Sequence, residues 1–95
     1  MLIEPIELER GTAVGLKMDM EHAPLLVIRA PRGFIMCGYL NIDTAQHLGD
    51  VAVMVTGVSS FDDVLAANVA GTTQAAEELG IKVGMTAKAA LELMF

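Results

Sequence analysis

The chain has 95 residues, of which 54% are hydrophobic, and its six basic and twelve acidic side chains give a formal net charge of −6. A chain of this length holds one domain, over residues 1–95, because two smaller cores would each be marginally stable. The negative charge argues against a nucleic-acid partner, since binding to phosphates needs clustered lysine and arginine, and the single cysteine excludes an intrachain disulfide.

The first forty residues predict β-structure. Residues 3–9 mix isoleucine and leucine with glutamate, a partial alternation that is typical of an edge strand with one wet face. Pro5 supports this position, because proline has no N–H to donate to a second neighbour. Residues 12–20 alternate more strictly, with lysine and aspartate on one face and four apolar side chains on the other, namely Val14, Leu16, Met18 and Met20.

A β-hairpin and a central strand are predicted next. The arms of the hairpin are residues 25–29 and 34–40, with Pro31 and Gly33 between them. Proline presets φ for the second position of a type I turn, and glycine accepts the positive φ that closes a short hairpin loop. Residues 51–58 are apolar and rich in β-branched side chains, which predicts a central strand that is covered on both faces.

Short helices are predicted in the second half of the chain. Asp43 is expected to cap the first of them, with Gln46 completing a capping box and Gly49 ending the helix. Residues 68–71 fit either a short strand or a loop. Three further helices are expected after capping residues, which are Ser60, Thr73 and Thr86.

This order of strands first and helices afterwards indicates an α+β fold. We expect a mainly antiparallel sheet, made from the N-terminal strands, the hairpin over 25–40 and the strand over 51–58, packed by the short C-terminal helices. No linker, low-complexity tract or internal repeat divides the chain.

The apolar content is high for so small a domain. With glycine included and the single tyrosine left out it is about 62%, against about 45–50% in typical proteins. A small domain has much surface for its volume, so we expect part of this material to be buried between copies in a homo-oligomer. Many of these residues are alanine and valine, which surfaces also tolerate, so a monomer is the alternative.

Nothing in the sequence predicts export or a membrane. The N-terminus has an early acid, Glu4, and no basic stretch followed by an apolar run, so we expect no signal peptide. No apolar segment approaches the roughly 20 residues that are needed to span a bilayer. We therefore expect a cytoplasmic protein, and the lone thiol of Cys37 is typical of a reducing compartment.

Two segments of the chain resemble a known family. They are residues 33–41 (GFIMCGYLN) and 78–86 (ELGIKVGMT), and between them Gly57 and Val58 are followed by FDDVL at 61–65. These segments are similar to the YunC-like family of small bacterial and archaeal proteins without an assigned activity. The resemblance covers roughly residues 25–93. It implies a single α+β domain, and it implies no catalytic residue.

Cys37 is the foremost candidate for a catalytic residue. A nucleophilic thiol needs a nearby base or a positive field to form the thiolate, and the sequence offers His22 and His47 for this role. Either histidine would reach Cys37 only if folding brings them together. The alternative is that Cys37 is a small buried hydrophobic residue of a strand.

A candidate ligand site lies along the second arm of the hairpin. Gly38 inside a strand marks either a bulge or a close backbone approach, and a close approach would let a ligand or a neighbouring subunit lie against the main chain. Together with Arg32, Tyr39 and Asn41, Gly38 is a candidate for binding a small anion or metabolite at a subunit junction.

No metal or cofactor site is predicted. Asp43 and His47 have the i, i+4 spacing that can chelate a divalent ion, but two ligands are too few and Asp43 is better explained as a helix cap. Neither the phosphate-binding loop motif nor the dinucleotide-binding fingerprint occurs in the chain.

Three functions are compatible with these features. A non-catalytic homo-oligomeric binding or assembly module is favoured by the apolar content and by the lack of a complete catalytic set. The alternatives are a small-anion or metabolite binder near Arg32, Tyr39 and Asn41, and a cysteine-dependent enzyme or redox protein that uses Cys37. The sequence alone does not show whether the protein is an enzyme. It also identifies neither the ligand nor the number of copies in the oligomer.

Overall fold

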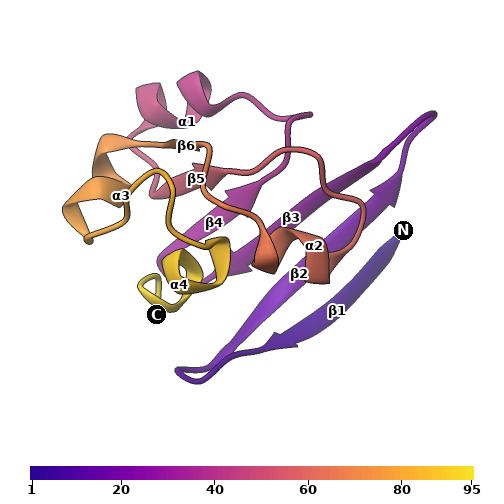
Figure 1. Ribbon diagram of the computed structural model, residues 1–95, viewed down its shortest axis with the longest axis horizontal. Coiled ribbons are helices and arrows are strands. Elements are labelled where there is room, and N and C mark those ends of the chain that lie inside the picture. The colour runs from indigo at the N-terminus through magenta and orange to yellow at the C-terminus, as the bar shows by residue number, and fades with distance from the viewer.

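Six strands form one sheet, described from Met1 to Phe95 by a computed structural model (Figure 1). Neighbouring strands are antiparallel except β4 and β5, which are parallel. The predicted mainly antiparallel sheet is confirmed, and the N-terminal strand lies at its edge as expected. In chain order and in sheet order the strands are β1 (Leu2–Glu7), β2 (Thr12–Asp19), β3 (Pro24–Ala30), β4 (Gly33–Met36), β5 (Ala52–Met54) and β6 (Gly71–Thr72).

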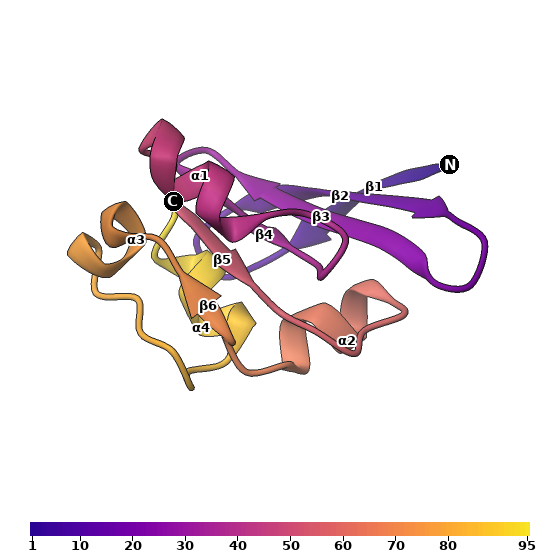
Figure 2. The same ribbon diagram turned by 90° about the horizontal axis from the view of Figure 1, so that it is seen from above.

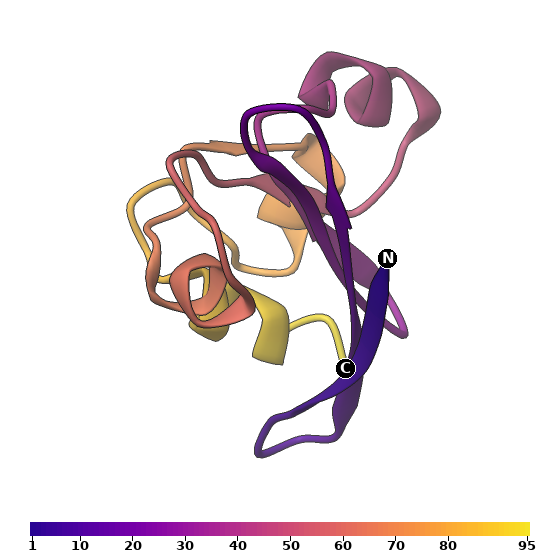
Figure 3. The same cartoon turned by 90° about the vertical axis from the view of Figure 1, so that its right-hand side faces the viewer.

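Four short helices cover the two faces of the sheet unequally. Three of them lie on one face: α2 (Phe61–Ala66), α3 (Gln74–Glu78) and α4 (Ala87–Glu92). The remaining helix, α1 (Ile42–Leu48), connects β4 to β5 and lies on the other face (Figures 2 and 3). The predicted packing by short C-terminal helices is confirmed. None of the helices is long and apolar enough to cross a membrane.

The main core fills the space between the sheet and the helices α2 to α4. The alternation of β3 points Leu26 and Ile28 to this side, and α4 contributes a buried stripe that includes Ala90 and Leu91. A smaller apolar cluster lies under α1 and consists of Met36, Ala45 and Ala52. The apolar cluster under α1 contains residues of β4 and β5 and none of β1, β2 or β3.

The predicted hairpin forms, but its glycine has a different role from the predicted one. Ala30 pairs with Gly33, so Pro31 and Arg32 are the two loop residues. Gly33 does not have a positive φ. A Cβ at this position would lie 2.7 Å from Cγ1 and 2.8 Å from the carbonyl oxygen of Val51. The close approach of that segment, and not the turn, therefore requires glycine here.

Two strands are shorter than predicted. β4 ends at Met36 instead of residue 40, and β5 covers Ala52–Met54 instead of residues 51–58. Beyond these points the two chain segments separate, because one leads to α1 and the other to α2 on the opposite face. Gly57, with a φ of 70°, lies in the second of these segments.

The caps of α2, α3 and α4 are the predicted ones, Ser60, Thr73 and Thr86. The cap of α1 is different, because the side chain of Asn41 accepts the N–H of Asp43 at 2.8 Å. Asp43 therefore lies in the first turn and not at the cap. The predicted capping box is also wrong, since the side-chain oxygen of Gln46 accepts the N–H of Gln74, 2.7 Å away. This bond ties α1 to the start of α3.

The segment over residues 68–71 combines the two predicted alternatives. Asn68 forms an isolated β-bridge with Thr86, and strand β6 begins at Gly71. The N–H of Ala70 donates to the carbonyl oxygen of Met54 at 2.8 Å. Bonding to β5 therefore starts one residue before β6.

The start of α2 gives the fold one pH-dependent contact. The backbone N–H of Ser59 donates to the Asp63 carboxylate at 3.1 Å and the Ser59 hydroxyl donates to it at 2.9 Å. These bonds favour the charged carboxylate and lower the pKa of Asp63 below its usual value of 3.8. Because the pKa is lower in the folded state, this stabilisation is present above the usual pKa and is lost as the pH falls through the folded-state pKa.

We expect Asp63→Asn to lower the melting temperature near neutral pH, and we expect this difference from the wild type to shrink in acid. Thermal melts followed by circular dichroism across the acidic range measure it. The control is Asp62→Asn, because the neighbouring carboxylate of Asp62 accepts no hydrogen bond within the chain. An Asp63→Asn difference that stays constant into strong acid would contradict the assignment.

Candidate functional site

A crevice lies at the carboxyl ends of the parallel strands β4 and β5. After β4 the chain passes to α1 on one face of the sheet, and after β5 it passes to α2 on the other face (Figure 2). Where the connections of two adjacent parallel strands leave to opposite faces, their loops part, and ligands of open α/β sheets bind at such points. The topology of the sheet thus accounts for the position of the crevice.

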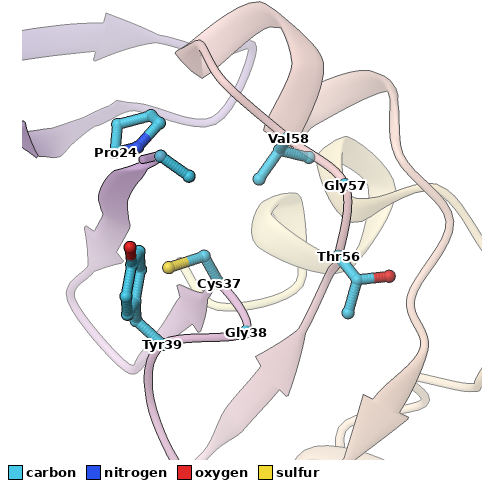
Figure 4. Close-up of a pocket in the computed structure, with 8 residues that line it drawn as sticks. Pro24, Cys37, Gly38, Tyr39, Thr56, Gly57 and Val58 are labelled. Atoms are coloured by element: carbon cyan, nitrogen blue, oxygen red, sulfur yellow. The ribbon is translucent and has the colours of Figure 1, made fainter. Parts of the chain in front are cut away.

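The crevice has a volume of about 330 Å³ and is built from three chain segments (Figure 4). One segment follows β4, one follows β5, and one leads into β3. Tyr39 and Pro24 line one side, Val58 lies across from them, and the sulfur of Cys37 points into the space between. The lining residues are Ala23, Pro24, Cys37, Gly38, Tyr39, Thr56, Gly57 and Val58.

This lining contains no charged side chain. Its polar side-chain atoms are the thiol of Cys37 and the hydroxyls of Tyr39 and Thr56, and the Thr56 hydroxyl points away from the crevice (Figure 4). Several backbone N–H groups of the lining donate no hydrogen bond within the chain, namely those of Gly38, Tyr39, Gly57 and Val58. The crevice is therefore an uncharged, mainly apolar hollow between two loops whose amide groups have no partner in the protein.

Cys37 is buried, with 4% of its surface exposed. Its sulfur accepts the N–H of Leu26 at 3.3 Å, which ties the end of β4 to β3. The exposed ring of His22 lies 3.8 Å from the Glu21 carboxylate, and His47 lies in the last turn of α1. Neither histidine lines the crevice. No three ligand-type side chains come together to hold a metal ion.

Comparison with known proteins places the chain in a family. Residues 36–94 match the model of a domain of unknown function, DUF1805. The chain belongs to this family. The match begins at the last residue of β4, so it includes both loops that form the crevice and all four helices, and it leaves out β1 to β3.

Two relatives of the chain match it over nearly its full length. The uncharacterized protein YunC of Bacillus subtilis (strain 168) is 32% identical over 93 residues, which are 94% of this chain and 92% of that protein. The crystal structure of a protein of unknown function, TA1206, from Thermoplasma acidophilum is 37% identical and has a TM-score of 0.94, covering 99% of this chain and 92% of that chain. The resemblance to the YunC-like family is thereby confirmed.

The residues that were predicted to bind a ligand do not form one site within the chain. Gly38 and Tyr39 line the crevice, whereas Asn41 is occupied as the N-cap of α1. Arg32 lies in the hairpin loop at the other end of β4, where its guanidinium donates to the carbonyl oxygen of Leu93 at 3.3 Å. Gly38 and Tyr39 are therefore the part of the predicted site that the fold places at a cavity.

Two glycines of the crevice contribute in different ways. Gly57 has a φ of 70°, which other residues rarely adopt. Gly38 has no positive φ, and a Cβ at this position would meet only the methyl group of Thr56, at 3.9 Å. The fold of the chain does not require a glycine at residue 38. It forms part of the crevice lining.

Sequence reasoning missed the part of the crevice that comes from other segments, namely Pro24 and the loop with Thr56, Gly57 and Val58. Their position depends on the parallel pairing of β4 with β5, which the hydrophobic pattern of either segment does not show. The available signal was Gly57 within an apolar run, because an isolated glycine in a strand pattern marks a break or a close approach.

A second surface lies on the face of the sheet that carries α1. The cluster under α1 includes no residue of β1, β2 or β3, so no helix covers this side of these three strands (Figure 3). Strand alternation and register place a contiguous set of apolar side chains here, which we name the open face: Ile3, Pro5, Val14, Leu16, Met18 and Val27. Ile3 is 59% exposed and Val14 is 51% exposed. The apolar face that was predicted for residues 12–20 thus points away from the core.

Proposed function

We propose that the protein is a non-catalytic assembly module that forms a homo-oligomer through the open face. The observation that supports this function is the open face itself, where six apolar side chains of three neighbouring strands lie side by side without a covering helix. Removing apolar surface from water is the main driving force of protein association. The high apolar content of the sequence is explained in part by these residues.

A second copy of the chain is the occupant that the charges of this surface favour. The strands β1 to β3 place only two charged side chains on this side, Glu7 and Arg29. These two charges cancel, so this side of the three strands presents no net charge to a second copy, whereas the whole chain has a net charge of −6. In a twofold arrangement, Arg29 of one copy can approach Glu7 of the other. The open face has no cluster of like charges that would attract a strongly charged partner.

The size of the open face limits the affinity of such a dimer. Three strands spaced about 4.8 Å apart, with about 3.3 Å per residue over some seven residues, span roughly 300 Å² in projection. A standard stable interface buries about 800 Å² per partner. Two such sheets can stack about 10 Å apart, and the bulky side chains of Met18 and Ile3 add contact area beyond the projection. We therefore expect association no tighter than the micromolar range.

The test is sedimentation equilibrium of the wild type and of Val14→Lys over a concentration series across the micromolar range. We expect the wild type to associate and Val14→Lys to stay monomeric, because the new ammonium group would lie at the centre of the interface beside Arg29. Val83→Lys is the matched control, since Val83 is 61% exposed and lies outside the open face.

Circular dichroism should show that both lysine variants are folded, because each replaces an exposed side chain. A wild type that stays monomeric at the highest concentration would overturn the proposal. So would association of Val14→Lys that equals that of Val83→Lys, because the interface would then lie elsewhere.

A further inference from the structure

We infer that the crevice at the carboxyl ends of β4 and β5 is a binding site for a small, uncharged ligand that has a planar ring and a hydrogen-bond acceptor. This inference is independent of the open face, since none of the lining residues belongs to that surface. The location supports a binding site, because the loops of the two parallel strands part here for a reason of topology.

The shape of the crevice indicates the planar ring. The side chain of Tyr39 lines one side and is 49% exposed, so about half of its surface is free to contact a ligand. Val58 and Pro24 provide further apolar surface around the same space (Figure 4). Aromatic rings stack on flat partners in offset or edge-to-face arrangements. A ligand ring between Tyr39 and Val58 would bury its two faces against these side chains. Apolar surface of the ligand and of both side chains would then be removed from water.

The electrostatics of the crevice indicate an uncharged ligand. No lysine, arginine or histidine lines it to hold an anion, and no aspartate or glutamate lines it to hold a cation. An ion that enters a mainly apolar hollow loses hydration and gains no opposite charge, which costs binding free energy. The negative net charge of the chain further disfavours anions. The small anion that the sequence analysis considered is therefore the less suitable ligand.

The backbone of the two loops indicates the hydrogen-bond acceptor. The N–H groups of Gly38, Tyr39, Gly57 and Val58 have no acceptor within the chain. Pockets for small molecules combine an apolar lining with a few polar groups that fix orientation, and backbone N–H groups are common among these. A carbonyl oxygen or a ring nitrogen of the ligand would supply the acceptor.

The volume of about 330 Å³ limits the ligand to roughly one ring with a short substituent. It lies at the lower end of the range of about 300–1,000 Å³ that is usual for small-molecule sites. A dinucleotide or another large cofactor would extend far beyond these walls. The sulfur of Cys37 points into the crevice and provides a polarisable contact for the ring, as sulfur atoms do beside aromatic groups.

Three related probes test this ligand class by amide-resolved NMR titration of the ¹⁵N-labelled protein. Benzamide has an uncharged ring and a carbonyl acceptor, benzoate has nearly the same shape with a negative charge, and acetamide has the acceptor without the ring. We expect benzamide to cause saturable shifts at the amides of Gly38, Tyr39, Gly57 and Val58. Benzoate and acetamide should each bind at least about tenfold more weakly, a difference of about 1.4 kcal/mol.

A variant at the wall of the crevice tests the location. Gly38 is one of the lining residues, and Gly38→Val can be accommodated because only the Thr56 methyl group lies within 4 Å of the added Cβ. We expect this variant to weaken benzamide binding by about tenfold or more and to leave the amide spectrum of the core unchanged. Gly38→Ala should have an intermediate effect. Val14→Lys is the matched control for the open face and should bind benzamide as the wild type does.

Four results of these titrations would contradict the inference. Benzamide without saturable shifts at the two loops would overturn the site. Equal binding of benzoate, or of acetamide, would overturn the assigned ligand class. Benzamide binding that persists unchanged in a folded Gly38→Val would show that the probe occupies another place. Loss of binding in Val14→Lys would make the crevice dependent on self-association, against the independence that we infer.

Discussion

Thr73→Val is expected to lower the free energy of unfolding by about 2–4 kcal/mol, the cost of an uncapped helix and a buried donor without a partner. The Thr73 hydroxyl is buried and accepts the N–H of Ala52 at 3.2 Å and the N–H of Ala76 at 3.3 Å. It also donates to the carbonyl oxygen of Asp50 at 2.6 Å. One side chain therefore caps α3 and completes the bonding at the start of β5. Valine keeps the shape and removes all three bonds.

Thr72→Val is the control for this substitution. The neighbouring hydroxyl of Thr72 makes a single longer bond, to the carbonyl oxygen of Thr73 at 3.3 Å, and its residue is half-buried. We expect it to cost less than about 1 kcal/mol. Urea unfolding at one fixed protein concentration measures both variants, since self-association would shift the apparent stability. Equal costs for Thr72→Val and Thr73→Val would show that the Thr73 hydroxyl does not join these elements.

Gly33→Ala is expected to have the second large effect, a loss of about 1–3 kcal/mol, which is typical of overpacking. The added methyl group would lie 2.8 Å from the carbonyl oxygen of Val51 and 2.9 Å from the sulfur of Met94. That carbonyl oxygen accepts the N–H of Phe34 at 3.1 Å. The backbone between α1 and β5 must therefore move and lengthen a hydrogen bond, because a side-chain rotation cannot relieve the contact with Val51.

Gly38→Ala is the matched control, because it makes the same chemical change just beyond the other end of β4. Its methyl group would meet only Thr56, at 3.9 Å. We expect the free energy of unfolding to change by no more than about 0.5 kcal/mol, as for most surface positions. If the unfolding midpoints of the two variants shift equally, the close approach at Gly33 does not constrain the fold.

Gly33 and Gly38 differ in what the fold requires of them. The packing demands a glycine at residue 33, because a Cβ there would be too close to Val51 and Met94. Neither φ nor packing demands a glycine at residue 38, which lines the crevice. The same substitution thus tests the fold at one end of β4 and the inferred ligand site at the other.

Local patterns were sufficient for the helices and for most strands. Ser60, Thr73 and Thr86 cap three helices as predicted, because a side-chain oxygen that accepts a nearby N–H acts within a few residues of sequence. Errors occur where two signals compete over a short distance, as for Asn41 and Asp43 at the start of α1. Both residue types are good caps, and the choice between them depends on where the chain leaves β4.

The sequence predicted only some of the residues that line the candidate site. Cys37, Gly38 and Tyr39 were predicted as site residues and line the crevice, whereas His22 and His47 do not join them. Arg32 and Tyr39 are close in sequence but lie beyond opposite ends of β4. An extended strand separates its ends by about 3.3 Å per residue. Residues that flank β4 are therefore near each other in the sequence but far apart in space.

The sequence by itself determined the α+β class, the family resemblance, the caps of α2, α3 and α4, and the alternation of residues 12–20. Only the tertiary structure decided that β4 and β5 run parallel, and hence that their loops form a crevice. It also decided that the apolar face of β2 is the open face and not part of the core. The alternation of a strand shows that two faces differ, but which face is covered depends on where distant helices pack.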